Sequence, residues 1–177
     1  MCSRVYKRSG AFRPGYNDVE ICEEWRTFSN FDRWCDEHFI EGAVLDKDLL
    51  VPGSKIYSPE TCCFVPDYVN TCLSTSSRTK RASLFGVHIR KKDGKISASI
   101  TKNNRKIHLG YFNSEEDGHF AWLQAKAESI REVAERYRTE CSYFSPQIYD
   151  SLIKRADFFL GFAERREIYE EKQNGSN

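Results

Sequence analysis

The sequence predicts an α+β protein, in which helices and strands fall in separate stretches of the chain. Apolar residues recur every three or four positions through about residues 20–39, 115–139 and 146–171, which is the period of amphipathic helices. Between residues 85 and 112 they alternate with polar residues, which is the period of strands. Residues 74–81, STSSRTKR, contain no apolar side chain and have the composition of a linker. Two small domains joined by this linker are therefore expected.

The first domain, residues 1–73, is predicted to mix helices with a hairpin. Within ICEEWRTFSNFDRWCDEHF the apolar residues share one helical face and acidic residues lie opposite, so one or two short helices are expected. The next stretch, LDKDLLVPGSKIYSPETCCFVPDYVN, is divided by two turn-forming pairs, Pro52-Gly53 and Ser58-Pro59. This stretch is expected to form a hairpin followed by a short terminal helix.

The second domain, residues 82–140, is predicted to be a three-stranded antiparallel sheet packed on a helix. Two pairs that favour tight turns, Asp93-Gly94 and Asn103-Asn104, separate its strand-like runs. The runs are Phe85–Arg90, Lys95–Lys102 and Lys106–Phe112.

Two helices are expected after the sheet. Ser114 stands three residues before Asp117, which is the spacing of a side-chain N-cap, and Glu115 and Glu116 place negative charge at the positive end of the helix dipole. Residues 141–177 are expected to form a last helix, from Pro146 to about residue 171, and a polar tail.

Charge is distributed unevenly, although the 177 residues carry 27 Lys and Arg against 26 Asp and Glu. Residues 78–106 hold 10 basic residues and one acidic residue, Asp93, whereas 8 basic and 12 acidic residues precede them and 9 and 13 follow. Alternation in the predicted strands places apolar residues, including Ile89 and Ile107, against the helix and polar residues on the outer face. The sheet is therefore predicted to present a polar, basic surface.

This outer face has the character of a nucleic-acid-binding surface. A sheet of two or three strands can enter the major groove of duplex DNA, where polar side chains meet base edges and flanking Lys and Arg contact phosphates. The alternative interpretation is a solvated sheet face with no nucleic-acid partner. The candidate DNA-binding residues are His88, Arg90, Lys91, Lys92, Lys95, Ser97, Ser99, Thr101, Lys102, Arg105, Lys106 and His108.

The segment FGVHIRKKDGKISASITKNNRKIHLGYFNSEEDGHFAWLQAKAESIREVAERY resembles the plant APETALA/ethylene-response-factor DNA-binding domain, in the form also found in phage-borne nucleases. The resemblance covers about 55 residues and includes the landmarks Gly86-Val87, Leu109-Gly110-Tyr111-Phe112 and Ala121-Trp122. Domains of that family have three strands and a helix, and they bind DNA with the outer sheet face. The resemblance therefore implies the same docking mode, with small hydroxyl residues and His108 where the plant domains often have arginine or tryptophan.

The first domain resembles the N-terminal part of phage-borne HNH endonuclease-like proteins of the homing-endonuclease type, through EICEEWRTFSNFDRW and LDKDLLVPGSKIYSPETCCFVPDYVN. In that family a hairpin and a helix hold one divalent cation, and a histidine activates water. The resemblance implies Asp46 and Asp48 as ligands of Mg or Mn, with His38 and Asn70 as further catalytic candidates. Lys47 stands where the family has its histidine base.

Two functional hypotheses remain open. The first is a DNA-binding protein of the phage HNH endonuclease class, with metal-dependent phosphodiester hydrolysis at Asp46 and Asp48, which would project from one face of a strand. The second is a catalytically inactive, nuclease-derived DNA-binding regulator, or an inhibitor of host machinery with a host protein as partner. The oligomeric state stays open under both hypotheses.

The chain shows no sign of export or membrane insertion. No apolar run approaches the roughly 18–20 residues of a membrane span, and MCSRVYKRSG lacks the apolar stretch of a signal peptide. The seven cysteines are an odd number and include no C-x-x-C spacing, so neither a secreted disulfide framework nor a zinc ribbon is indicated. A cytoplasmic protein is expected, in the bacterial host if a phage encodes it.

Overall fold

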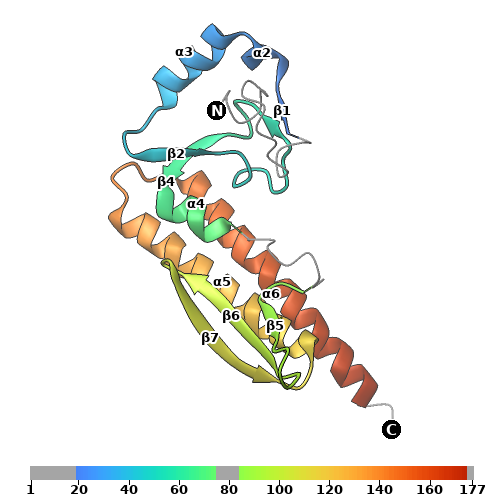
Figure 1. The fold of residues 1–177 in the computed structure, drawn as a ribbon. Coiled ribbons are helices and arrows are strands. Elements are labelled where there is room, and N and C mark those ends of the chain that lie inside the picture. The colour runs from blue at the N-terminus through green and yellow to red at the C-terminus, as the bar shows by residue number, and fades with distance from the viewer. Residues whose placement is uncertain (1–18, 75–83, 175–177) are drawn as a thin grey trace. The chain divides into compact units, whose positions relative to one another are not determined.

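The structure, a computed structural model, describes residues 19–74 and 84–174. It confirms the α+β class, because five helices, two two-stranded sheets and one three-stranded sheet lie within these residues (Figure 1). The chain divides into two compact units, residues 1–70 and 71–177. No helix in the described part of the chain combines the length and the apolar composition that crossing a membrane requires.

Two short helices open the first unit. The helix α2 spans Glu23–Arg26 and α3 spans Phe28–His38, which confirms the short helices expected within residues 20–39. Each helix buries one tryptophan, Trp25 from α2 and Trp34 from α3, while their charged residues stay exposed. The amphipathic pattern of the sequence therefore correctly predicts which face of these helices is buried.

The rest of the first unit contains the predicted hairpin and the beginning of the terminal helix, whose residues 71–73 belong to the second unit. β2 (Ala43–Asp46) pairs antiparallel with β4 (Cys63–Pro66), and α4 (Asp67–Leu73) follows β4 directly. Between the two hairpin strands lies β3 (Ile56–Tyr57), which pairs in parallel with β1 (Glu20–Ile21). Strands of two residues are too short to show a period of two, so the sequence did not predict this second pair.

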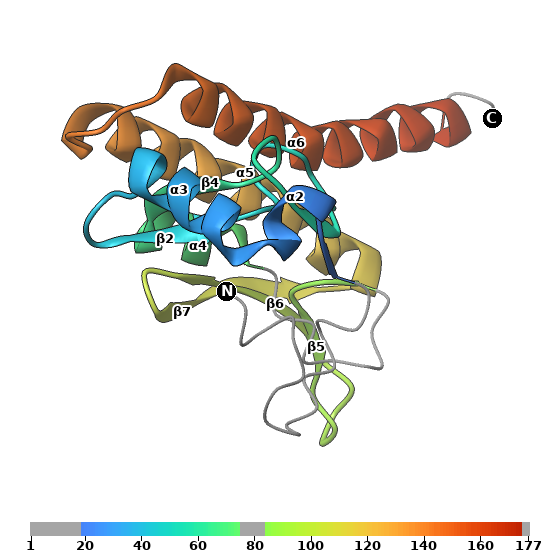
Figure 2. The same cartoon turned by 90° about the horizontal axis from the view of Figure 1, so that it is seen from above.

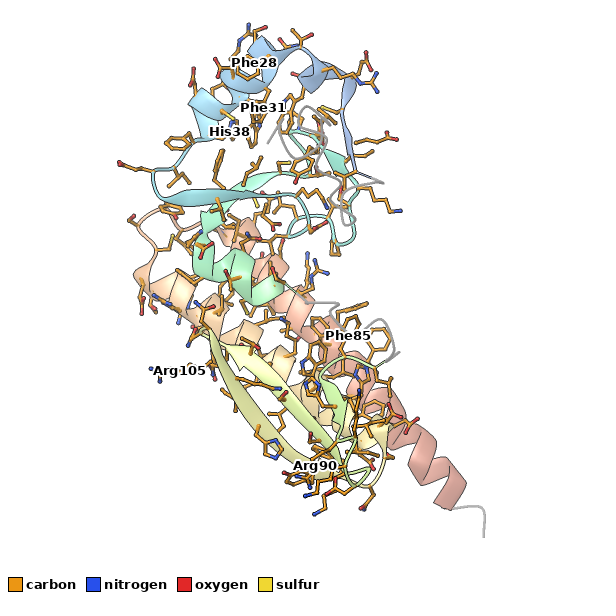
Figure 3. The ribbon with its side chains drawn as sticks, in the orientation of Figure 1. Phe28, Phe31, His38, Phe85, Arg90 and Arg105 are labelled. Carbon is orange, nitrogen blue, oxygen red and sulfur yellow. The ribbon has the colours of Figure 1, made fainter. Side chains whose placement is uncertain are left out.

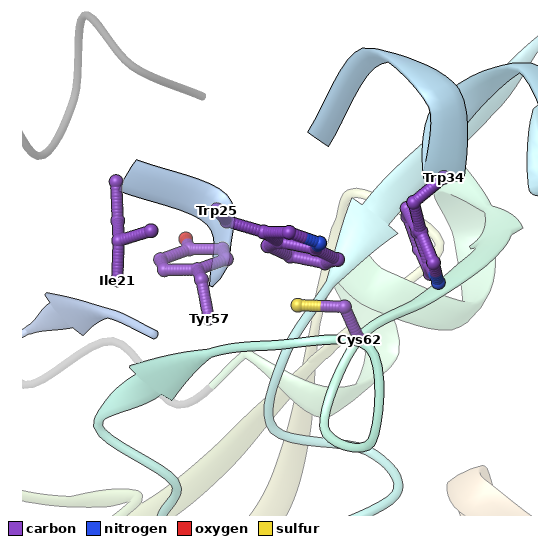
Figure 4. Packing of buried hydrophobic residues seen from close by; sticks show 5 residues of the cluster. All are labelled: Ile21, Trp25, Trp34, Tyr57 and Cys62. Carbon is purple, nitrogen blue, oxygen red and sulfur yellow. The ribbon is translucent and has the colours of Figure 1, made fainter. Parts of the chain in front are cut away.

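An aromatic cluster forms the core of the first unit (Figure 4). Its buried members come from β1, both helices, β3 and the segment between β3 and β4. The rings of Trp25 and Trp34 lie 4.8 Å apart between centroids, within the range of favourable aromatic packing. The five buried residues are Ile21, Trp25, Trp34, Tyr57 and Cys62.

The second unit contains the predicted three-stranded antiparallel sheet. Its strands are β5 (Val87–Ile89), β6 (Ile96–Lys102) and β7 (Arg105–Phe112), with β6 in the centre. Asn103 and Asn104 both have positive φ, 51° and 59°, as the two central residues of a type I′ hairpin turn require. This turn sets the β6–β7 pairing, in which Lys102 lies opposite Arg105.

Two long helices complete the second unit. The side chain of Ser114 accepts a hydrogen bond from the backbone N–H of Asp117 and so caps α5 (Glu115–Glu140), as predicted. After a short loop, α6 (Pro146–Asn174) runs back along α5. α5 packs against both the sheet and α6, so the unit has three layers, with α5 in the middle (Figures 1 and 2).

A buried lysine holds the last turn of α4 against α5 within the second unit. Lys126 is only 5% exposed, and its ammonium group donates to the carbonyl oxygens of Cys72 and Ser74. The thiol of Cys72 also donates to the carbonyl oxygen of Ser129, at 3.8 Å. Burial lowers the pKa of Lys126. Residues 71–74 therefore pack with the second unit, and the rest of the predicted linker, 75–81, lies outside the described residues.

Candidate nucleic-acid interface

The outer face of the sheet is set by an irregularity in the β6–β7 pairing. Ala98 lies opposite Gly110, but the next residue of β6, Ser99, lies opposite His108. Leu109 is thus an extra residue in β7, a β-bulge, and it packs with the core cluster beneath the sheet. Residues of β7 after the bulge therefore lie on the opposite side of the sheet from the side that strict alternation would give them.

Tyr111 reaches the outer face because of this bulge. Strict alternation from His108 would turn Tyr111 toward the helix, but the observed register places it opposite Ser97. Its side chain is 64% exposed, its ring lies 4.9 Å from that of His108, and the ammonium of Lys95 lies 5.9 Å from its ring centroid. The sequence signal that could have revealed this residue is Gly110, because a glycine inside a strand often marks a bulge.

His88 and Ser99 meet at the centre of the outer face. His88 Nε2 lies 3.1 Å from Ser99 Oγ, and Ser97 Oγ donates to the carbonyl oxygen of His88 at 3.3 Å. Ser99 was predicted to be an open part of this face, but it is only 8% exposed and instead supports the His88 ring. Burial, followed by the nearby charge of Lys106, lowers the pKa of His88 below its ordinary 6.5. This shift favours the neutral imidazole of His88.

The β5–β6 turn concentrates positive charge at one end of the sheet. Arg90 was expected as the last residue of a strand, but β5 ends at Ile89 and Arg90 opens the turn. Its guanidinium binds the carboxylate of Asp93, and Arg90 lowers the pKa of that carboxyl. Lys91 and Lys92 are both exposed in the same turn.

The opposite end of the sheet is less basic than the sequence predicted. Lys102 contacts the carboxylate of Glu132 on α5, so its ammonium is turned to the helix side, and its assignment to the DNA-binding face is corrected. Thr101 and Lys106, which pair across β6 and β7, are exposed on the outer face as expected. Arg105 marks this end of the sheet in Figure 3, far along the sheet from Arg90.

Two apolar residues expected to face inward are only partly covered. Ile89 is 52% exposed and Ile107 is 42% exposed, whereas Ile100 on the central strand is 6% exposed. Ile89 and Ile107 lie on the two edge strands, where a single covering helix leaves more of the surface open. The central strand is therefore the part of the sheet that α5 covers best.

The predicted metal site is not assembled in the way the sequence indicated. Asp46 is the last residue of β2, and its Oδ1 accepts hydrogen bonds from the backbone N–H groups of Asp48, at 2.9 Å, and Leu49, at 2.7 Å. Asp48 lies beyond the strand, so the expectation that both carboxylates project from one strand face is wrong. Asp46 is 8% exposed, and burial raises its pKa. Its carboxylate closes the turn after β2.

Lys47, at the position of the family's histidine base, is held by its surroundings. Its ammonium donates to Asp48 Oδ1 and to the carbonyl oxygen of Ser54, both at 2.6 Å, and lies 5.9 Å from the ring centroid of Tyr57. The side chain is 13% exposed. These contacts fix the loop between β2 and β3.

The other two catalytic candidates, His38 and Asn70, lie on the helices of the first unit. The ring of His38 stacks on Trp34, with 4.5 Å between centroids, and its Nδ1 lies 2.8 Å from the carbonyl oxygen of Trp34 at the end of α3. Asn70 lies on α4. Among the described residues, no three His, Cys, Asp or Glu side chains are grouped closely enough to hold a metal ion. Asp46, Asp48 and His38 therefore do not form such a group.

Comparison with known proteins identifies no relative of this chain. No family model matches the chain, and no curated protein or solved structure matches it. The two family resemblances described above stay predictions from the sequence.

Proposed function

We propose that the protein binds duplex DNA through the outer face of the β5–β6–β7 sheet. The observation that carries this proposal is the register of the three strands, which gathers the polar side chains of all of them on one side. The opposite side packs on α5. The residues gathered on the outer face are His88, Ser97, Ser99, Thr101, Lys106, His108 and Tyr111.

The dimensions of the sheet support docking in the major groove. Neighbouring strands are about 4.8 Å apart, so the outer two of three strands are separated by about 10 Å. The major groove of B-form DNA is about 12 Å wide and accepts such an element, whereas the minor groove, about 6 Å wide, does not. The sheet face is therefore expected to lie in the major groove.

The chemistry of the face divides between base edges and phosphates. The imidazole of His88 and the hydroxyl groups of Thr101 and Tyr111 can form hydrogen bonds, as contacts to base edges require. The exposed lysines of the β5–β6 turn and Lys106 supply positive charge at the perimeter, where phosphates lie. Within residues 84–106, Asp93 is the one acidic residue, so little repulsion opposes a DNA backbone.

For the first unit, the geometry around Asp46 favours the non-catalytic hypothesis. The two backbone N–H groups that donate to Asp46 lie in the turn that directly follows it. The ammonium group of Lys47 donates hydrogen bonds to Asp48 and to the carbonyl oxygen of Ser54. A loop-closing carboxylate and a tethered lysine give this turn a structural role. We therefore propose a DNA-binding regulator without Mg- or Mn-dependent cleavage.

The salt dependence of binding tests the proposed surface. Each phosphate contact adds about 0.9 to the slope of log K against log salt concentration. Lys106→Gln is expected to weaken binding of a short duplex and to reduce the slope by about 0.9. Lys154→Gln, which removes the same charge from the exposed surface of α6, is the matched control and should leave affinity and slope unchanged. Equal effects of the two variants, measured by fluorescence anisotropy, would exclude the sheet as the docking surface.

A further inference from the structure

Arg90 and Asp93 form a side-on pair in the β5–β6 turn. Arg90 Nε donates to Asp93 Oδ1 at 2.7 Å, and Arg90 Nη2 donates to Asp93 Oδ2. Two parallel N–H bonds to one carboxylate fix the plane of a guanidinium as well as its position. The pair is partly exposed, with side-chain exposures of 49% for Arg90 and 35% for Asp93.

The backbone of the turn holds both partners in place. The N–H of Arg90 donates to the carbonyl oxygen of Lys95 at 2.9 Å, and the carbonyl oxygen of Arg90 accepts from Gly94 at 2.9 Å. Asp93 Oδ1 also lies 3.3 Å from the N–H of Lys95. Gly94 adopts a φ of 70°, which allows the chain to close here. The orientation of the guanidinium is therefore set before any ligand arrives.

One edge of the Arg90 guanidinium is left open. Arginine has five N–H donors in a rigid plane, and Asp93 occupies the Nε and one Nη2 donor. The two Nη1 donors and the second Nη2 donor have no acceptor among the described residues. Figure 3 shows Arg90 at the end of the sheet where β5 leads into the turn to β6. The open edge is the one that can make two parallel hydrogen bonds to a ligand.

We propose that Asp93 is a positioning residue, which orients Arg90 so that its open edge recognises guanine in the major groove. This inference rests on the proposed docking of the sheet on duplex DNA. Guanine presents O6 and N7 as neighbouring acceptors, and a bidentate arginine is the side chain that best matches them. The lone acidic residue of the basic segment thus contributes specificity, although it removes net positive charge.

A simpler role for Asp93 makes a different prediction. If Asp93 only neutralises Arg90, its removal raises the affinity for every duplex and changes no preference between bases. If Asp93 orients Arg90, its removal frees the guanidinium to contact phosphates and weakens the preference for guanine. The readout is therefore the discrimination between bases, which a charge effect alone does not alter.

The experiment uses the full chain and a DNA pool selected by it from random duplexes. The pool is amplified with either dGTP or 7-deaza-dGTP, which replaces the guanine N7 acceptor with C–H, and the two affinities are compared. If selection enriches no sequence, the unselected pool is used. The wild-type protein is expected to bind the 7-deaza pool about fivefold or more weakly. Asp93→Asn and Arg90→Lys are both expected to reduce this ratio below about twofold.

Two controls make each outcome decisive. Glu128→Gln removes one negative charge from the exposed surface of α5 and should keep the wild-type ratio. Unchanged circular dichroism and melting temperature show that Asp93→Asn retains the hairpin. A wild-type ratio near one, or an Asp93→Asn variant that keeps the wild-type ratio, overturns the role of Asp93 while DNA binding stands. Absence of binding to either pool overturns the proposed function itself.

Discussion

Gly86→Ala is expected to unfold the second unit or to destabilise it by roughly 2 to 5 kcal/mol. A Cβ at this position would lie 2.1 Å from Cδ1 and 2.3 Å from Cγ of Trp122, distances that no side chain tolerates. Gly86 also has a φ of 80°, which L residues rarely adopt. Trp122 is 7% exposed and packs in the core cluster beneath the sheet, so it has little room to move.

Gly94→Ala is the matched control for this prediction. Gly94 has a similar φ of 70°, but no atom lies within 4 Å of a Cβ built there, so its substitution tests backbone strain alone. A loss of about 1–2 kcal/mol is expected. Hydrogen exchange of α5 peptides, followed by mass spectrometry, measures the second unit separately from the first. Equal losses in the two variants would show that the contact with Trp122 does not decide the fold of this unit.

Asp46→Ala is expected to destabilise the first unit by about 2–4 kcal/mol, because it leaves the N–H groups of Asp48 and Leu49 without their acceptor. Asp46→Asn keeps a side-chain oxygen in the same place and should stay within about 1 kcal/mol of the wild type. Hydrogen exchange of peptides that contain β2 measures both variants. A loss in Asp46→Asn as large as that in Asp46→Ala would contradict the turn-closing role.

The pH dependence of the Asp46 variants has a defined sign. Burial raises the pKa of Asp46 above its ordinary 3.8, so the folded state holds this proton more tightly than the unfolded chain. Its contribution to the free energy of unfolding is therefore complete below pH 3.8 and is lost as the pH rises through the folded pKa. The wild type should lose stability relative to Asp46→Asn as the pH rises from 3.8 through the folded pKa of Asp46.

The same variants separate the two hypotheses for the first unit. The non-catalytic hypothesis predicts that neither the wild type nor Asp46→Asn nicks plasmid DNA with Mg or Mn. Metal-dependent nicking by the wild type that Asp46→Asn abolishes, at unchanged stability, would restore the nuclease hypothesis.

Local signals in the sequence predicted most elements of the second unit. The period of two found the three strands, the turn residues Asn103 and Asn104 fixed one hairpin, and Ser114 located the start of α5. These features depend on residues close together in the chain, so a sequence pattern contains them. The β5–β6 hairpin was expected to have a two-residue Asp-Gly turn. Its loop instead has four residues, 91–94, because Arg90 pairs with Lys95.

The features that the sequence missed depend on contacts between distant residues or on one inserted position. Tyr111 reached the outer face through a bulge, which shifts faces without a change in the alternating pattern. Lys102 follows the outward Thr101 in β6 and so lies on the helix side, where it contacts Glu132, thirty residues later. Asp46 was expected to bind a metal, but a carboxylate at the end of a strand can equally accept from its own turn. Sequence spacing alone does not distinguish these cases.

Chemical-shift mapping of the full chain with a short duplex tests the central claim most directly. If the outer face of β5–β6–β7 docks on DNA, the largest amide shift changes should occur at residues of that face and at the β5–β6 turn. They are expected at His88, Ser97, His108, Tyr111 and residues 91–94. Changes confined to α6 or to the first unit, with those residues unmoved, would contradict the claim that this sheet binds DNA.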